Sequence, residues 1–139
     1  MSNYYELILD AVNETGKNIK DLETKGILGK NTFYIFKNSA PSLSTMLEIA
    51  NFLDMSIDYI LDRCDNNYFK KYSLSQTNFY SNLKTLLGKS TSQVKVCKDL
   101  GISRTNFSRW KNGTSPTISK LISLANYLNC NIDDLLDHE

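Results

Sequence analysis

Apolar residues recur at spacings of three and four along most of the chain, and no segment alternates for long between apolar and polar positions. Residues in this rhythm lie on one face of an α-helix, so the pattern predicts an all-α protein. In the C-terminal half, the stripe Phe79, Leu83, Leu86 and Leu87 predicts a helix that ends near Gly88. No apolar run reaches the roughly 18 residues that a membrane span requires.

Four more short helices are expected after this one. Each follows a residue that suits a helix start, and these are Ser92, Ser103, Pro116 and Asn131. Between the second and third helices, Gly101 permits a left-handed turn and Ile102 can enter the core. The third helix, at residues 103–112, ends at Gly113.

The C-terminal pattern has an earlier copy in the chain. Residues 49–62 return as residues 124–137 at a spacing of 75, and seven of these fourteen positions are identical. Repetition of this kind indicates a duplicated supersecondary unit. We therefore predict two tandem five-helix domains, at residues 1–63 and 79–139, joined by an aromatic linker at residues 64–78. The linker residues Tyr68, Phe69 and Tyr72 are expected to pack on one or both domains.

The predicted helix at residues 103–112 has two distinct faces. Phe107 and Trp110 are three residues apart, so they share one face and should anchor the helix to the core. Hydrogen-bonding side chains occupy the opposite face and the N-terminal end: Arg104, Thr105, Ser108, Arg109 and Asn112. An anchored helix after a three-residue turn suits entry into the DNA major groove, where arginine can bond guanine bidentately. A merely solvated polar face is the alternative.

The segment SQVKVCKDLGISRTNFSRWKNG, residues 92–113, resembles the helix-turn-helix of the lambda-repressor/Cro (XRE-type) family. The resemblance extends without a gap over residues 79–137, and the turn, the anchoring aromatic residue, the Asn-Gly pair and the proline all fall in place. It implies a prokaryotic or phage-type transcription regulator, foremost a repressor, that binds double-stranded DNA without a cofactor. With the outward face, it assigns base contacts to Arg104, Thr105, Ser108 and Arg109. It assigns phosphate contacts to Ser92, Gln93, Asn106, Lys111 and Asn112.

The first copy resembles the same family less closely, from residue 4 to residue 63. Ile19 replaces Gln93, and Ile27 replaces the turn glycine. Weak DNA contacts or partner contacts are assigned to Lys30, Asn31, Thr32, Tyr34 and Ile35. Tyr34 and Ile35 stand side by side on the expected outward face, where bulky apolar residues read bases poorly and suit contact with another protein.

Charge separates the two copies. Residues 1–63 carry a net charge of −3 and residues 79–139 carry +3, so the whole chain, at +1, conceals the difference. The segment 79–120 holds eight basic residues and one acidic residue, whereas its equivalent, 4–45, is neutral. A local basic surface is what DNA binding requires, whatever the net charge of the chain.

These features leave two classes of function open. The first is a sequence-specific DNA-binding regulator that forms a homodimer through residues 1–63 or pairs its two unequal copies on one asymmetric site. The second is a protein-binding adaptor, such as an antitoxin or an inhibitor, that uses helix-turn-helix domains as interaction modules. Loss of function on mutation of Arg104 and Arg109 would favour the first class.

Catalysis and metal binding are not indicated. Cys64, Cys97 and Cys130 lack the spacing of a zinc site or a disulfide framework. The single histidine, His138, is next to the last residue and is expected to fray. Glycine-rich phosphate loops are missing. We expect a cytoplasmic protein that is not an enzyme and needs no metal, cofactor or membrane.

Overall fold

The structure is a computed structural model that describes residues 3–88 and 92–139. The described residues form eight α-helices and two 3-10 helices, with one isolated β-bridge and no strand, which confirms the all-α prediction. Two compact units divide the chain. The described residues up to Leu74 form the first unit together with His138–Glu139, and Ser75–Asp137 form the second. Within the described residues, no helix has the length and apolar character to cross a membrane.

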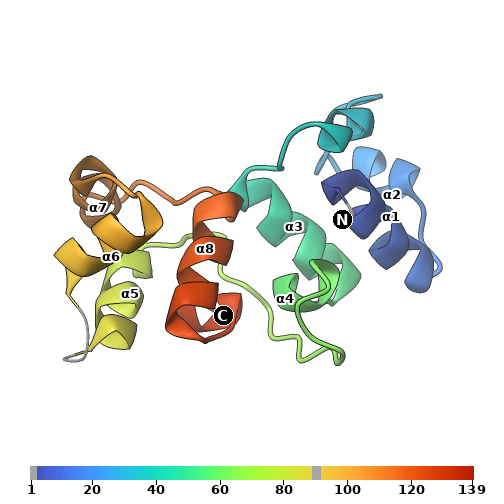
Figure 1. Ribbon diagram of the computed structural model, residues 1–139. Helices are drawn as coiled ribbons and strands as arrows, with labels where there is room; N and C mark the ends of the chain where they lie inside the picture. The colour runs from blue at the N-terminus through green and yellow to red at the C-terminus, as the bar shows by residue number, and fades with distance from the viewer. Residues whose placement is uncertain (1–2, 89–91) are drawn as a thin grey trace. The chain divides into compact units, whose positions relative to one another are not determined.

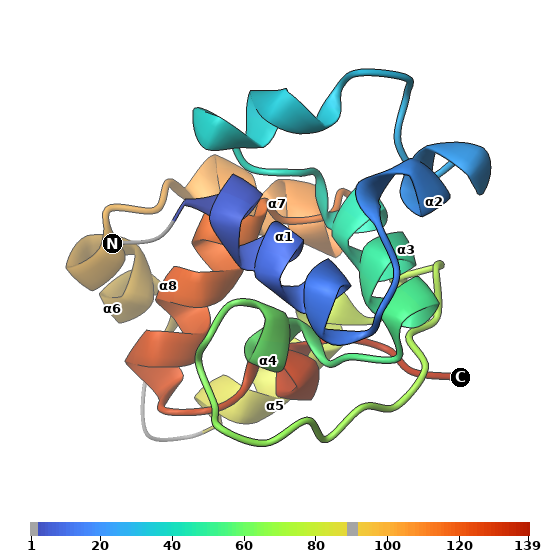
Figure 2. The same ribbon diagram turned by 90° about the vertical axis from the view of Figure 1, so that its right-hand side faces the viewer.

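The first unit contains five helical segments. They are α1 (Tyr4–Glu14), α2 (Ile19–Thr24), the 3-10 helix η1 (Phe33–Lys37), α3 (Leu43–Leu53) and α4 (Ile57–Ile60). A capping side chain fixes the start of each α-helix, because Asn3, Asn18, Ser42 and Ser56 each accept a backbone N–H of the first turn. Helix α1 contacts both η1 and α4 (Figure 2). Its apolar face joins Leu22, Met46 and Ile57 in a core that excludes water.

The second unit also contains five helical segments, with its 3-10 helix last instead of third. They are α5 (Phe79–Leu87), α6 (Gln93–Leu100), α7 (Arg104–Lys111), α8 (Ile118–Leu128) and the 3-10 helix η2 (Ile132–Leu135) (Figure 1). Ser92 and Ser103 cap α6 and α7 as predicted, and Thr117 caps α8. Helix α5 packs against α7 and against η2. The core of this unit includes Leu83, Val96, Phe107 and Leu121, all at most 1% exposed.

The turn between α6 and α7 has the predicted geometry. Gly101 ends α6 at φ 66°, in the left-handed region, and its N–H bonds the carbonyl of Cys97. A Cβ at Gly101 would meet nothing within 4 Å, so the backbone conformation, rather than space, favours glycine here. Ile102 then enters the core at 4% exposure. Three residues therefore suffice to redirect the chain from α6 into α7.

The corresponding connection of the first unit departs from a helix-turn-helix. Eight residues, 25–32, separate α2 from η1, and η1 is a short 3-10 helix. Gly26 at φ 76° stops α2, and Asn31 adopts φ 59° just before η1. Lys30 and Asn31 align in sequence with Arg104 and Thr105, yet they lie in this connection and not on a helix. In the first unit, the short 3-10 helix η1 thus takes the place of the α-helix expected to match α7.

The predicted linker, residues 64–78, is largely part of the first unit. Tyr72 is fully buried there; its backbone N–H and C=O bond the Asn51 side chain, and its hydroxyl oxygen accepts the N–H of Ile57 at 2.8 Å. Tyr68, in contrast, is 71% exposed. The fraying expected at His138 is wrong, because its ring lies against that of Tyr72 with 4.8 Å between centroids. A buried tyrosine with satisfied polar atoms explains why the compact unit extends past residue 63.

Candidate nucleic-acid interface

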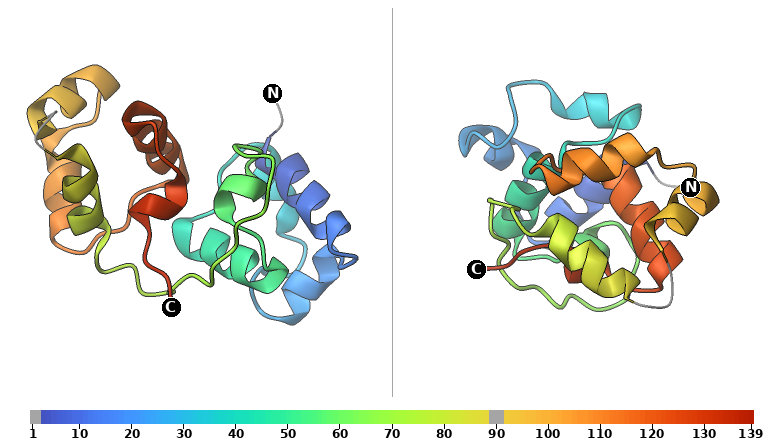
Figure 3. Two further views of the ribbon diagram at one scale, coloured as in Figure 1. Left: turned by 90° about the horizontal axis from the view of Figure 1, so that it is seen from below. Right: turned by 90° about the vertical axis from the view of Figure 1, so that its left-hand side faces the viewer.

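Helix α7 is anchored by its two aromatic residues. Phe107 is 1% exposed and Trp110 is 5% exposed, and their ring centroids are 5.0 Å apart. The edge of Phe79, from α5, meets the Trp110 ring at a centroid distance of 5.3 Å. Figure 3 shows α5 beside α7 within this unit. Aromatic pairs in this geometry hold a helix firmly, which fixes the direction of its opposite face.

The opposite face of α7 carries every side chain predicted to contact bases. Arg104, Thr105, Ser108 and Arg109 are all exposed. Neither arginine forms an ion pair with any residue of the described ranges 3–88 and 92–139. The N–H groups of both guanidinium groups are therefore available to donate hydrogen bonds to a guanine edge or a phosphate.

The residues predicted to contact phosphates lie on α7 and at the start of α6. Ser92, Lys111 and Asn112 are exposed, whereas Gln93 and Asn106 are half-buried. Ser92 accepts the N–H of Lys95 at 3.2 Å, so its oxygen already serves the helix. The backbone N–H of Asn112 closes α7. The structure thus places this group on the two helices that flank the turn.

A contact missed by the sequence analysis involves the Gln93 amide. The Tyr80 hydroxyl, on α5, lies 3.5 Å from Gln93 Oε1. The hydroxyl donates to this carbonyl oxygen, so the amide NH₂ of Gln93 remains available as a donor. Tyr80 and Gln93 are thirteen positions apart, and no periodic pattern in the sequence indicates that they are in contact.

A carboxylate contact ties α6 to α8. Asp99 Oδ2 accepts a hydrogen bond from the Tyr127 hydroxyl at 2.6 Å and lies 3.1 Å from Lys95 Nζ. The Tyr127 hydrogen bond, followed by that of Lys95, lowers the pKa of the Asp99 carboxyl below its ordinary value. The same hydrogen bond to Asp99 raises the pKa of Lys95. Asp99 therefore stays ionised and Lys95 stays protonated at neutral pH.

The first unit presents a different surface at the equivalent positions. Tyr34 is 64% exposed and Ile35 is 44% exposed, which places both outward as predicted. Lys30 and Asn31 are exposed and Thr32 is half-buried, with its hydroxyl donating to the Gly29 carbonyl at 2.6 Å. The buried rings of Phe33 and Phe36 anchor one side of η1, and the exposed side chains of Tyr34 and Ile35 make its outer side apolar.

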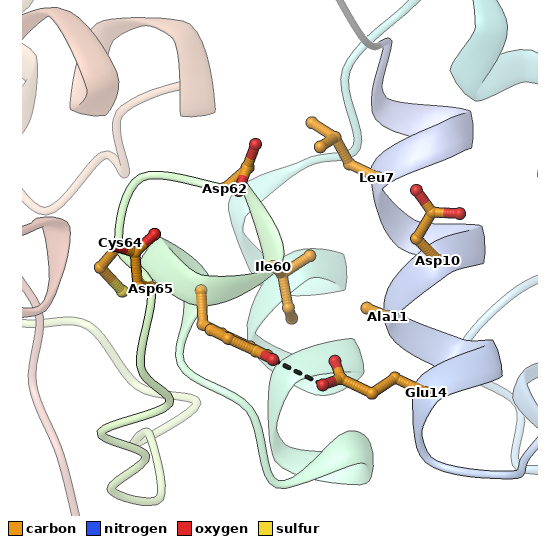
Figure 4. Close-up of a pocket in the computed structure, with 9 residues that line it drawn as sticks. Leu7, Asp10, Ala11, Glu14, Ile60, Asp62, Cys64 and Asp65 are labelled. Carbon is orange, nitrogen blue, oxygen red and sulfur yellow. Dashed lines mark hydrogen bonds between the residues drawn. The ribbon is translucent and has the colours of Figure 1, made fainter.

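An acidic groove lies between α1 and the segment after α4 in the first unit. It encloses about 350 Å³, and four carboxylates line it: Asp10, Glu14, Asp62 and Asp65. Figure 4 shows the Glu14 side chain directed from α1 toward the α4 side, where the Tyr59 hydroxyl donates to its carboxylate at 2.5 Å. These carboxylates repel phosphate, because both carry negative charge, so this face of the first unit does not suit DNA. Neither these carboxylates nor any other three His, Cys, Asp or Glu side chains of the described residues are arranged so that they could hold a metal ion.

Comparison with known proteins agrees with the geometry of the second unit. Residues 82–139 match the family model of the Cro/C1-type HTH DNA-binding domain. No curated protein and no solved structure matches the chain. The match confirms the family resemblance for the C-terminal part and supports DNA binding and transcription regulation as its general function. The match does not extend to residues 1–74.

Proposed function

We propose that the second unit binds double-stranded DNA sequence-specifically and that the protein regulates transcription, acting as a repressor. The outward face of α7 supports this proposal most strongly, since it presents Arg104 and Arg109 without ion pairs among the described residues. The match of residues 82–139 to a DNA-binding domain supports it independently. A repressor needs no chemistry of its own, so we propose that the protein is not an enzyme and acts without a cofactor, in the cytoplasm with its DNA.

The two groups of residues have different roles in this proposal. Arg104, Thr105, Ser108 and Arg109 contact base edges in the major groove and determine the sequence that is bound. Ser92, Gln93, Asn106, Lys111 and Asn112 lie at the ends of α6 and α7, where they contact phosphates and fix the register of α7 on the duplex.

A strong dependence on salt is the first expected result. Each neutralised phosphate releases counterions, so log K against log[salt] should have a slope of about −0.9 per contact. With four or five contacts from each bound unit, the slope lies near −4 for one unit and near −8 for two units on one duplex. Titration of a fluorescent 30-base-pair duplex at several KCl concentrations measures it. A slope near zero would contradict the phosphate contacts.

We further propose that two copies of the chain associate through the first unit, so that two α7 helices bind two half-sites. The adjacent exposed side chains of Tyr34 and Ile35 support this role, because large apolar side chains are enriched in protein interfaces. Half-sites for such a dimer are spaced about one DNA turn apart. The acidic groove supports a protein-facing first unit as well, since it keeps that surface away from phosphates.

Light scattering after size exclusion tests the dimer. The measured molar mass of the wild-type protein should be twice that of one chain. The double variant Tyr34→Ser with Ile35→Ser should have the mass of a monomer and unchanged helical content. Tyr68→Ser is the matched control, because this tyrosine is also exposed but lies far from η1 in sequence. A wild-type monomer that still binds DNA tightly would instead support pairing of the two units on one asymmetric site.

The acidic first unit also favours a second candidate function, that of an adaptor or inhibitor which binds another protein. In that case the groove with its four carboxylates would face a basic partner surface. Substitution of Arg104 and Arg109 separates the candidates, because an adaptor that works through the first unit would keep its function.

A further inference from the structure

Asp99 is an exception within the basic part of the second unit. It is the one acidic residue between positions 79 and 120, where eight basic residues gather. Its Oδ2 atom has two partners, the Lys95 ammonium at 3.1 Å and the Tyr127 hydroxyl at 2.6 Å. A carboxylate in a basic field that binds phosphates opposes that binding, so its presence calls for a reason.

Helix packing does not supply that reason, as the first unit shows. The helix starts Ile19 and Gln93 are 74 residues apart, so Asp21 and Lys25 correspond to Lys95 and Asp99. From Pro41 the spacing is 75, so Phe52 corresponds to Tyr127. The first unit therefore lacks both the carboxylate and the phenol at these positions, and α2 and α3 form without the contact. The carboxylate–phenol contact is thus confined to the unit with the basic surface.

We propose that Asp99 limits the affinity of the second unit for DNA backbone by holding the Lys95 ammonium away from phosphate. This inference rests on the proposed function. Lys95 is two residues after Gln93, in the first turn of α6, the part of that helix that faces phosphates in the proposed complex. An ammonium paired with Asp99 neutralises no phosphate unless the pair first separates.

The effect applies equally to all DNA sequences. Lys95 carries a compact charge that phosphate recognises and base pairs do not distinguish, so its restraint lowers specific and non-specific affinity by the same factor. Non-specific sites outnumber operators in a genome, and weaker backbone binding shortens each stay of a regulator on a non-specific site. Asp99 therefore adjusts how long the protein stays on DNA and leaves the preferred sequence unchanged.

Asp99→Asn tests the proposal, since it removes the charge and keeps an oxygen that can accept the Tyr127 hydroxyl. Binding of a random-sequence 30-base-pair duplex is measured by anisotropy at several KCl concentrations. Freeing one phosphate contact should raise the association constant about fivefold at 0.15 M salt and steepen the log–log slope by about 0.9. The gain should disappear in the double variant Asp99→Asn with Lys95→Gln.

Two control variants separate this effect from packing and from total charge. Tyr127→Phe removes the hydroxyl but keeps the carboxylate, so no gain in affinity is expected. Asp54→Asn changes the net charge by the same amount in the first unit, where Asp54 is exposed, and should leave the slope unchanged.

The outcomes are distinct. Unchanged or weaker binding by Asp99→Asn would overturn the inference, as would a gain that persists without Lys95. If the wild-type protein and Asp99→Asn both fail to bind the duplex, the proposed function fails, and this inference with it. A gain that requires Lys95 supports both.

Discussion

Trp110→Ala is expected to lower the free energy of unfolding of the second unit by about 3–5 kcal/mol. The indole is 5% exposed and lies between the rings of Phe79 and Phe107, so truncation leaves a cavity between α5 and α7. Since small domains have about 5–15 kcal/mol of stability in total, this loss approaches the whole stability of the unit. Chemical denaturation followed by circular dichroism measures it.

Matched variants identify the cause of that loss. Trp110→Phe retains most of the ring contact and should cost much less, and Tyr68→Ala, at an exposed position of the first unit, should cost little. A Trp110→Ala protein with the unfolding midpoint of the wild type would show that the indole does not anchor α7. The orientation of the Arg109 face would then have no structural basis.

Arg109→Ala and Arg104→Ala are each expected to weaken operator binding by about 1–3 kcal/mol, because a bidentate contact to a base edge contributes that much discrimination. Both side chains are exposed, so neither substitution should change the unfolding midpoint. Competition titrations against duplexes with single base-pair changes measure the loss. Each variant should become indifferent to the base pair that its arginine contacts.

Lys111→Ala is the matched control for the arginines. As a phosphate contact, it should weaken all duplexes uniformly and reduce the salt slope by about 0.9, without relaxing specificity. If both arginine substitutions left DNA binding and function intact, the protein-binding adaptor would be a better proposal than the DNA-binding regulator.

The structure of the second unit was predictable because its signals are local. Ser92, Gly101 and Ser103 fix the ends of α6 and α7, and each acts on backbone within four residues. The spacing of Phe107 and Trp110 alone determines which face of α7 is buried. Outward placement of Arg104 and Arg109 follows from the same periodicity, so the candidate site could be located without coordinates.

In the first unit, the sequence did not predict the local structure where that structure depends on tertiary contacts. A helix to match α7 was expected, but Gly26 and Asn31 adopt positive φ and lengthen the connection to eight residues. Tyr72 was assigned to a linker, because its bond to Ile57 bridges fifteen positions and leaves no periodic trace. The contact of Tyr127 with Asp99 bridges 28 positions and was missed for the same reason.

Selection of bound duplexes from a random pool at physiological salt tests the central claim most directly. That claim is that the exposed face of α7 determines the DNA sequence bound by the protein. The wild-type protein should enrich a defined motif, and Arg104→Ala with Arg109→Ala should lose the preference at the positions those arginines contact. Enrichment of the same motif by the wild type and the double variant, or of no motif by either, would contradict the claim.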